Sequence, residues 1–201
     1  FYKDKKVLIT GVTGFKGSWL ATWLILLKAK VYGIGYQLNK NKKLFYNLGL
    51  QKKIKVNMID VRDFKKLEKR INQIKPSIIF HLAAQPLIYE SYKNPYDTID
   101  INAKGTLNIM EIVRKSKFVK SVIIVTSDIC YESNNSTKGF KESDRLGGID
   151  PYSVSKANAE LIVKAYNKSF FENKRNRSTG ISTGRAGNVI GGGDWSSNRL
   201  I

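Results

Sequence analysis

Residues 6–17 read KVLITGVTGFKG, and this stretch decides the fold of the 201-residue chain. Its first five residues are mostly apolar and β-branched, which predicts a buried strand. Gly11, Gly14 and Gly17 follow with a GxxGxxG spacing and lead into an apolar periodic segment. In a strand-turn-helix unit these glycines permit the tight turn, the approach of backbone amides to a pyrophosphate, and close helix packing. The stretch therefore predicts a dinucleotide cradle; a glycine-rich turn without a ligand is the alternative.

Strand-like and helix-like segments alternate along the rest of the chain. The expected strands are residues 6–10, 30–34, 55–59, 77–82, 121–125 and 179–185, and the expected helices are residues 16–28, 64–74, 98–116 and 151–171. This alternation, with near-continuous apolar strands, indicates an α/β fold of the Rossmann type, a doubly wound parallel sheet with helices on both faces. We expect residues 1–187 to form the dinucleotide-binding domain. Residues 188–201 are expected to begin a small C-terminal substrate domain that is mostly absent.

Composition and charge restrict the class of protein. Hydrophobic residues make up 42% of the chain and charged residues 25%, which excludes a disordered or fibrous protein. The net charge of +19 raises the question of nucleic acid. Because 27 lysines and only 8 arginines are scattered along the chain, we interpret the charge as a solvated surface, with nucleic-acid binding as the alternative. The single cysteine, Cys130, is typical of a reducing, cytoplasmic setting, and no cluster of residues has metal-ligand spacing.

The other ends of the expected strands carry further candidates for a dinucleotide site. Residues 33–37, GIGYQ, contain neither a carboxylate for ribose hydroxyls nor an arginine for a 2′-phosphate, so NAD and NADP both stay open. Asp60 closes the third strand, where it would meet an adenine; a turn or helix-cap role is the alternative. Ala83 and Ala84 follow the fourth strand and leave room for a nicotinamide, or simply pack in the core. His81 is the only histidine and is expected to be structural.

A second group of residues predicts proton transfer. Tyr152 and Lys156 are four residues apart on an expected helix, so they share a face. An ammonium beside a phenol favours the phenolate, which makes the tyrosine a base near neutral pH. The fifth strand leads into Ser127 and Asp128, and a hydroxyl there can bridge a substrate alcohol and the phenolate. YxxxK by itself is common on protein surfaces, but here it opens the helix that follows the fifth strand and its strand-end serine.

This constellation resembles the extended branch of the short-chain dehydrogenases/reductases. Four stretches resemble, within that branch, the 4,6-dehydratases that act on CDP-glucose: residues 10–20 (TGVTGFKGSWL), 81–87 (HLAAQPL), 147–153 (GGIDPYS) and 185–195 (RAGNVIGGGDW). The resemblance covers essentially the whole chain. It implies a lyase that converts CDP-glucose to CDP-4-keto-6-deoxyglucose for deoxysugar and polysaccharide biosynthesis, with tightly held NAD. It also implies a cytoplasmic homodimer paired through the helices that start near Thr98 and Pro151, without nucleic acid or membrane partners.

The same resemblance implies roles for single residues. Tyr152, with Ser127 and Lys156, removes the proton of the sugar O4 during oxidation at C4, and Asp128 protonates the departing C6 hydroxyl. The implied cofactor contacts are Gly11, Gly14, Phe15, Lys16, Gly17, Asp60, Val61, Leu82, Ala83, Ala84, Tyr152 and Lys156. The implied substrate contacts are Gln85, Ser127, Asn188 and Arg199. Asn188 has a turn-forming role as its alternative, and Arg199 a solvated one.

One position departs from the family pattern. Family members carry lysine or glutamate directly after the aspartate, whereas this chain carries Ile129. Isoleucine can neither take nor give a proton, and the loss of a general base typically costs ~10²–10⁴ in rate. Water, Tyr131 or another group could serve instead. The alternatives are an NAD-dependent nucleotide-sugar epimerase or reductase, and a catalytically impaired dinucleotide-binding module.

Overall fold

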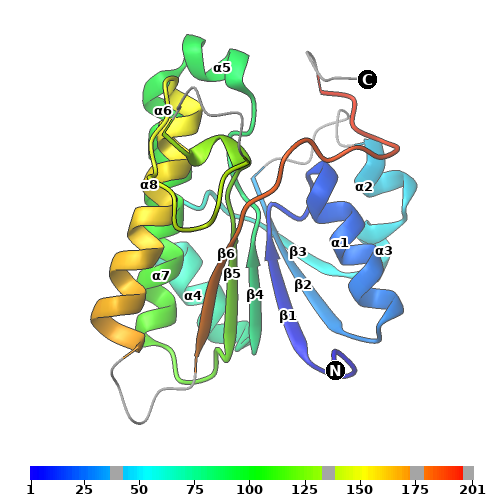
Figure 1. The fold of residues 1–201 in the computed structure, drawn as a ribbon. Helices are drawn as coiled ribbons and strands as arrows, with labels where there is room; N and C mark the ends of the chain where they lie inside the picture. Colours follow the sequence, from blue (N-terminus) through cyan, green and yellow to red (C-terminus); the bar gives the residue numbers. More distant parts are fainter. Residues whose placement is uncertain (37–42, 133–138, 173–178, 197–201) are drawn as a thin grey trace.

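A parallel sheet forms the centre of the molecule (Figure 1). The computed structural model describes residues 1–36, 43–132, 139–172 and 179–196. Within these residues the sheet has six strands in the order β3-β2-β1-β4-β5-β6. The strands are β1 (Lys6–Thr10), β2 (Lys30–Gly35), β3 (Lys55–Met58), β4 (Ile78–His81), β5 (Ser121–Val125) and β6 (Gly180–Gly184). The predicted fold class is confirmed, and the strand order reverses between β1 and β4, which places the binding crevice at their carboxyl ends.

Helices cover both faces of the sheet, as Figure 1 shows. One face carries α1 (Phe15–Leu26), α2 (Lys43–Asn47) and α3 (Leu50–Lys53), and the other carries α4 (Phe64–Ile74), α7 (Gly105–Lys115) and α8 (Pro151–Tyr166). The remaining elements are α5 (Ile88–Lys93), α6 (Pro95–Ile99), π-helical turns at Asp100–Lys104 and Asn167–Phe171, and a 3₁₀ turn at Asp128–Cys130. The sequence did not predict α2, α3 and α5, because helices of six residues or fewer show too little periodicity.

The central strand β1 is buried on both faces, as its continuous apolar sequence predicts. Leu8 packs into the core beneath α4, α7 and α8, whereas Val7 and Ile9 pack into the core beneath α1 and α3. All three side chains are fully buried. Because successive side chains of a strand point to opposite faces, one short apolar run serves both cores.

In residues 16–28 the helical spacing of apolar residues predicts that Trp19 and Trp23 are buried, but α1 exposes both. Trp19 is 43% exposed and Trp23 is 63% exposed, while the residues against the sheet are Gly17, Ser18, Ala21 and Leu24. A Cβ at Gly17 would lie 2.2 Å from the carbonyl oxygen of Gly11. The small residues therefore allow a close approach of α1 to the glycine-rich turn, which apolar periodicity alone does not reveal.

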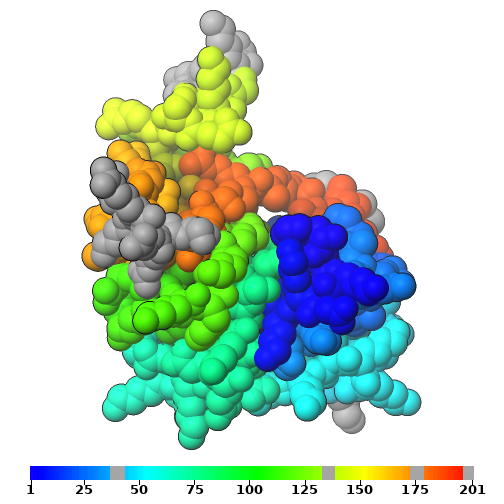
Figure 2. Space-filling model, turned by 90° about the horizontal axis from the view of Figure 1, so that it is seen from below, coloured from blue at the N-terminus to red at the C-terminus, as the bar shows by residue number. Residues whose placement is uncertain are grey.

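The chain after β6 crosses the carboxyl edge of the sheet towards α1 and α2 (Figures 1 and 2). Trp19 Nε1 donates a 3.0 Å hydrogen bond to the carbonyl oxygen of Gly192, and a Cβ at Gly193 would meet the Leu44 side chain. The described part, residues 188–196, thus packs on the N-terminal half of the fold. The expected start of a second domain at residue 188 stays a prediction.

Candidate active site

A cleft of about 1370 Å³ runs along the carboxyl edge of the sheet. The glycine-rich turn lines one part of it, and the ends of β3, β4 and β5 and the first turns of α8 line the rest. Its walls include every residue that the sequence analysis placed against the cofactor: Gly11, Gly14, Phe15, Lys16, Gly17, Asp60, Val61, Leu82, Ala83, Ala84, Tyr152 and Lys156. These roles stay predictions, and the fold brings the whole set to one cleft.

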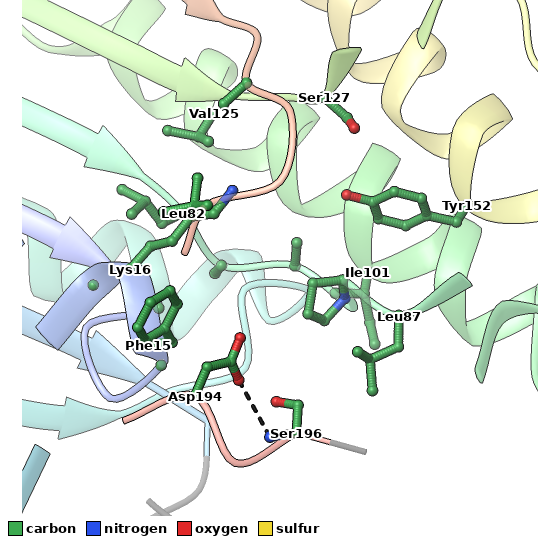
Figure 3. A pocket seen from close by; sticks show the side chains of 18 of the residues that line it. Phe15, Lys16, Leu82, Leu87, Ile101, Val125, Ser127, Tyr152, Asp194 and Ser196 are labelled. Carbon is green, nitrogen blue, oxygen red and sulfur yellow. Dashed lines mark hydrogen bonds between the residues drawn. The ribbon is translucent and has the colours of Figure 1, made fainter. Parts of the chain in front are cut away.

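The glycine-rich turn leads into a helix start that no side chain caps. Gly11 has a φ of 72°, and a Cβ there would lie 2.7 Å from the backbone nitrogen of Ala83. Gly14 is the N-cap of α1, and no side chain caps it and no acidic residue lies in the first turn. The amides of that turn carry the positive end of the helix dipole. Figure 3 shows the Lys16 side chain extending from the same turn into the cleft, which adds positive charge.

At the other end of the cleft, Asp60 is held by Arg62. The carboxylate accepts hydrogen bonds from Arg62 Nε at 3.0 Å and from Arg62 Nη2 at 2.7 Å, and Arg62 also contacts Asp97 and Asp100. Burial acts to raise the pKa of Asp60, but the bonds to Arg62 outweigh it and hold the pKa below its usual value. Asp63, not Asp60, caps α4. Asp60 therefore has a turn-stabilising partner, and any ribose or adenine contact must share that carboxylate.

Tyr152 is positioned by the start of α8. The Asp150 side chain accepts hydrogen bonds from the backbone amides of Tyr152, at 2.9 Å, and Ser153, at 3.0 Å, in a capping box, with Pro151 as the first helical residue. Tyr152 is 9% exposed and lines the cleft. Figure 3 shows its hydroxyl pointing into the cleft, on the side where the hydroxyl of Ser127 also faces the cleft.

Lys156 lies one turn beyond Tyr152 on the same face of α8. Its Nζ atom donates a 3.1 Å hydrogen bond to the Val125 carbonyl and lies 6.0 Å from the centre of the Tyr152 ring. The side chain is 6% exposed. Burial, together with the charge of Lys16, lowers the pKa of Lys156 to about 8. The predicted phenol–ammonium pair is therefore brought together in a buried setting.

The turn after β5 carries Ser127 and Asp128. Ser127 Oγ donates a 3.1 Å hydrogen bond to Asp128 Oδ1, and the Asp128 amide donates to the Ala186 carbonyl at 3.1 Å. Asp128 is exposed on the cleft wall, and Ile129, which is 36% exposed, lines the same cleft. The departure from the family pattern therefore lies on the wall of the cleft, beside Asp128.

Tyr131 lies beside the main cleft and has partners of its own. Its hydroxyl accepts a 2.7 Å hydrogen bond from Arg185 Nη1, and its ring stacks on Phe140 with the centroids 4.5 Å apart. It lines a neighbouring pocket of about 800 Å³ and not the main cleft. That pocket shares Asp128 and Ile129 with the main cleft, and the expectation that Tyr131 could replace the absent base stays a prediction.

The structure separates the predicted substrate residues. Asn188 is exposed on the cleft wall, whereas Gln85 is not among the lining residues. Gln85 Nε2 donates to Thr98 Oγ1 at 2.8 Å and Leu87 O at 3.1 Å, and Gln85 Oε1 accepts from the Leu87 amide at 2.6 Å. The amide group of Gln85 thus stabilises the turn before α5, because it finds partners there. Arg199 lies outside the described residues.

His81 and Cys130 have structural positions. His81 Nδ1 lies 2.7 Å from Thr10 Oγ1, and burial together with the charge of Lys156 lowers the pKa of His81 to about 3, so the ring is neutral. Cys130 is buried, and burial raises the pKa of its thiol. In the described ranges no three His, Cys, Asp or Glu side chains are grouped closely enough for a metal ion. Nor does a helix there have the length and apolar character to cross a bilayer.

Sequence reasoning missed the ion pair of Glu160 and Arg185. Arg185 Nη2 lies 2.9 Å from Glu160 Oε2, and Glu160 lies four residues beyond Lys156 on α8. A YxxxKxxxE spacing could have signalled a third polar residue on the catalytic face. The sequence could not show that Arg185 is its partner, because Arg185 follows β6 and lies 25 residues further along the chain.

The fold and the cleft define a short-chain dehydrogenase/reductase of the extended type. A family model described as GDP-mannose 4,6 dehydratase matches residues 8–180, and the chain belongs to this family. The chain is 43% identical to a CDP-glucose 4,6-dehydratase of Salmonella typhimurium, over 100% of this chain and 56% of that protein. It is 30% identical to a putative UDP-glucose 4-epimerase of Methanocaldococcus jannaschii, over 82% of this chain and 52% of the relative. It thus spans about half the length of these curated relatives.

Solved structures with low sequence identity share the fold. A UDP-Glc/GlcNAc 4-epimerase of Campylobacter jejuni superposes with a TM-score of 0.77 at 22% identity, covering 90% of this chain and 53% of the other. A dTDP-glucose 4,6-dehydratase of Streptomyces venezuelae, solved with NAD and TYD, gives 0.76 at 22% identity, covering 90% and 55%. The fold is thus common to dehydratases and epimerases and does not separate the two reactions.

Proposed function

We propose that the whole protein is a nucleotide-sugar 4,6-dehydratase that converts CDP-glucose to CDP-4-keto-6-deoxyglucose with NAD. The observation that carries this proposal is the joint position of Ser127, Tyr152, Lys156 and Asp128 in the cleft that contains the glycine cradle. The 43% identity to a CDP-glucose 4,6-dehydratase supports the choice of nucleotide sugar.

The residues present fit NAD at two places. The uncapped first turn of α1 suits the pyrophosphate. The small side chains of Ala83 and Ala84, which follow β4, line the cleft and leave room for the nicotinamide. When bound, the nicotinamide would take a hydride from the sugar C4 and later return it to C6. NAD rather than NADP is supported by solved structures of the same fold that contain NAD.

The described residues supply the groups for oxidation at C4 and the acid for the departing hydroxyl, but not the base for the C5 proton. Tyr152, as phenolate, takes the O4 proton, and the nearby Lys156 ammonium stabilises the phenolate. Ser127 holds the same oxygen by a hydrogen bond. Once C4 is a ketone, the C5 proton is acidic, and Asp128 is the group that donates a proton to the departing C6 hydroxyl. The C5 proton requires a base, which Ile129 cannot be.

The second candidate function is a nucleotide-sugar epimerase or reductase, and Ile129 favours it. Neither reaction needs a base for C5 at this position, and both need the Ser127, Tyr152 and Lys156 cluster.

Turnover of the purified whole protein with CDP-glucose and NAD tests both candidates. A keto product that has lost one water, detected by mass spectrometry and absent with Tyr152→Phe, is expected for the dehydratase. Products that keep the mass of the substrate, or differ by two hydrogens, contradict it in favour of the epimerase or reductase. Parallel reactions with UDP-, GDP- and dTDP-glucose test the nucleotide.

We further propose a cytoplasmic homodimer formed by α6, α7 and α8. Ile99, Leu107 and Leu161 expose apolar side chains on these three helices. An exposed apolar face of this kind suits pairing with its own copy. Light scattering of the whole protein should give a dimer or larger, and Leu161→Glu should shift it towards monomer; a wild-type monomer contradicts the proposal.

A further inference from the structure

The side chain of Glu160 is a buried carboxylate with every acceptor position occupied. It is 5% exposed. Oε1 accepts from Thr126 Oγ1 at 2.5 Å and from Arg185 Nε at 3.0 Å. Oε2 accepts from Thr183 Oγ1 at 2.9 Å and from Arg185 Nη2 at 2.9 Å. A carboxylate offers about four such positions, so this one is fully used.

These bonds connect α8 to the strand ends that carry the reaction. Lys156 holds the backbone of Val125, the last residue of β5, and Glu160, one turn further along α8, holds the side chain of Thr126. Ser127 is the next residue. Two successive turns of α8, the helix that carries Tyr152, therefore form hydrogen bonds to the two residues that precede Ser127.

Arg185 extends the connection to the turn of Asp128. The carbonyls on either side of it, those of Gly184 and Ala186, accept from the amides of Thr126 at 2.9 Å and Asp128 at 3.1 Å. The Arg185 side chain turns to Glu160 and also donates to the Tyr131 hydroxyl. The backbone of residues 126–128 is thus fixed on one side by the neighbouring chain and on the other by α8.

The charge of Glu160 makes this connection specific. Burial acts to raise the pKa of Glu160, but the hydrogen bonds from Arg185, Thr126 and Thr183 outweigh it and hold the pKa below the usual value. A buried charge is tolerated only where its partners are in place. A shift of α8 along β5 would break these directional bonds, whereas apolar packing between the two elements would resist such a shift less.

We propose that Glu160 is a positioning residue that sets the register of α8 on β5 and so aligns the Tyr152 hydroxyl with Ser127. Glu160 is not among the residues that line the cleft, so it acts through its partners. The inference rests on the proposed function only in that Tyr152 and Ser127 are the groups to be aligned.

The test uses Glu160→Gln, which keeps the size of the side chain and removes its charge. The phenolate of Tyr152 is followed in substrate-free protein by ultraviolet difference titration, each protein against its own Tyr152→Phe counterpart. Lys156, Lys16 and Asp128, the charged groups of the cleft near this tyrosine, are present in every protein. We expect a smaller phenolate fraction at pH 8 in Glu160→Gln. In turnover, kcat should fall about 100-fold, the order that a misplacement of ~1 Å costs, with KM within about twofold of wild type.

A purely structural role would lower the amount of folded protein without moving the titration. Glu111→Gln is the matched control, because Glu111 forms a similar two-point ion pair with Arg114 on α7, away from the cleft. It should leave the Tyr152 titration and kcat at wild-type values. If Glu160→Gln does not fold, Thr126→Val, which removes one of the four bonds, carries the same test with a smaller shift.

An unmoved titration in a folded Glu160 or Thr126 variant overturns the inference. Because the titration needs no substrate, it decides the role of Glu160 even if the protein does not act on CDP-glucose. Failure of the proposed function would show in wild-type turnover alone, so the two failures are distinguishable.

Discussion

Lys156 Nζ donates a hydrogen bond of 3.1 Å to the carbonyl oxygen of Val125, the last residue of β5. This bond attaches the helix that carries Tyr152 to the strand that leads into Ser127. It also places an ammonium group in a buried position, and burial there lowers the pKa of Lys156 to about 8.

The lowered pKa of Lys156 predicts an alkaline limit to activity. Above pH 8 the amine loses its charge and no longer favours the Tyr152 phenolate, so the rate should decline from about that pH. Lys156→Arg keeps its charge throughout this range, so its alkaline limb should lie at higher pH even if kcat is lower. Initial rates from pH 6 to about 10 measure the alkaline decline of wild type and of Lys156→Arg. The same limb in wild type and Lys156→Arg would assign the decline to another group.

Ile129→Lys should change the yield of the dehydrated product. A lysine at this cleft position restores an ionisable group. A well-placed general base contributes ~10² or more to the rate. Because the new lysine is not optimally placed, we expect dehydration at least about 10-fold faster than in wild type. The product is measured as loss of one water. Ile149→Lys is the control, because it adds the same charge at an exposed position in the neighbouring pocket. A wild-type rate that equals or exceeds the Ile129→Lys rate would show that another base removes the C5 proton.

Gly17→Ala should destabilise the protein although alanine is the better helix former. The helix preference is worth up to about 1 kcal/mol, but the new Cβ would lie 2.2 Å from the Gly11 carbonyl, and such overpacking costs about 1–3 kcal/mol. The melting temperature and NAD affinity, measured by calorimetry, should both fall. At Gly192 a Cβ meets nothing within 4 Å among the described residues, so Gly192→Ala should bind NAD as wild type does. Equal NAD binding by Gly17→Ala would argue against the cradle.

Arg62→Gln should weaken the protein at neutral pH more than at acid pH. Folding lowers the pKa of Asp60, so the stability from this carboxylate is present above its unfolded pKa of about 4 and is lost as the pH falls through the folded value. We expect a loss of about 1 kcal/mol at pH 7 that shrinks below pH 4, measured by urea unfolding. Lys66→Gln, which breaks an exposed pair with Asp63, should stay close to wild type at both pH values. A pH-independent difference for Arg62→Gln would contradict the assignment.

Local sequence patterns predicted the larger elements well. Apolar, β-branched runs marked all six strands to within one or two residues, and the helix expected at residues 98–116 is observed as α6, a π-helical turn and α7, starting at Pro95. The buried face of α1 could not be predicted in this way. Periodicity marks Trp19 and Trp23, whereas close packing on the glycine-rich turn selects Gly17 and Ala21.

The candidate site was predictable where motif and element coincide. The Tyr152 and Lys156 spacing and the strand-end Ser127 converge because parallel strands end at one edge of the sheet. The position of Gln85 was not predictable. Its side chain finds Thr98 and the Leu87 backbone, and those partners meet it only after the turn before α5 has folded.

The sequence by itself determined the sheet, the glycine cradle and the shared face of Tyr152 and Lys156, because each follows from residues close together along the chain. Only the tertiary structure decided which polar groups meet across elements. Glu160 with Arg185 and Tyr131 with Arg185 are pairs of this kind. Periodicity reports which face of an element is buried, but the side chain that arrives there from another element depends on how the strands and helices are stacked.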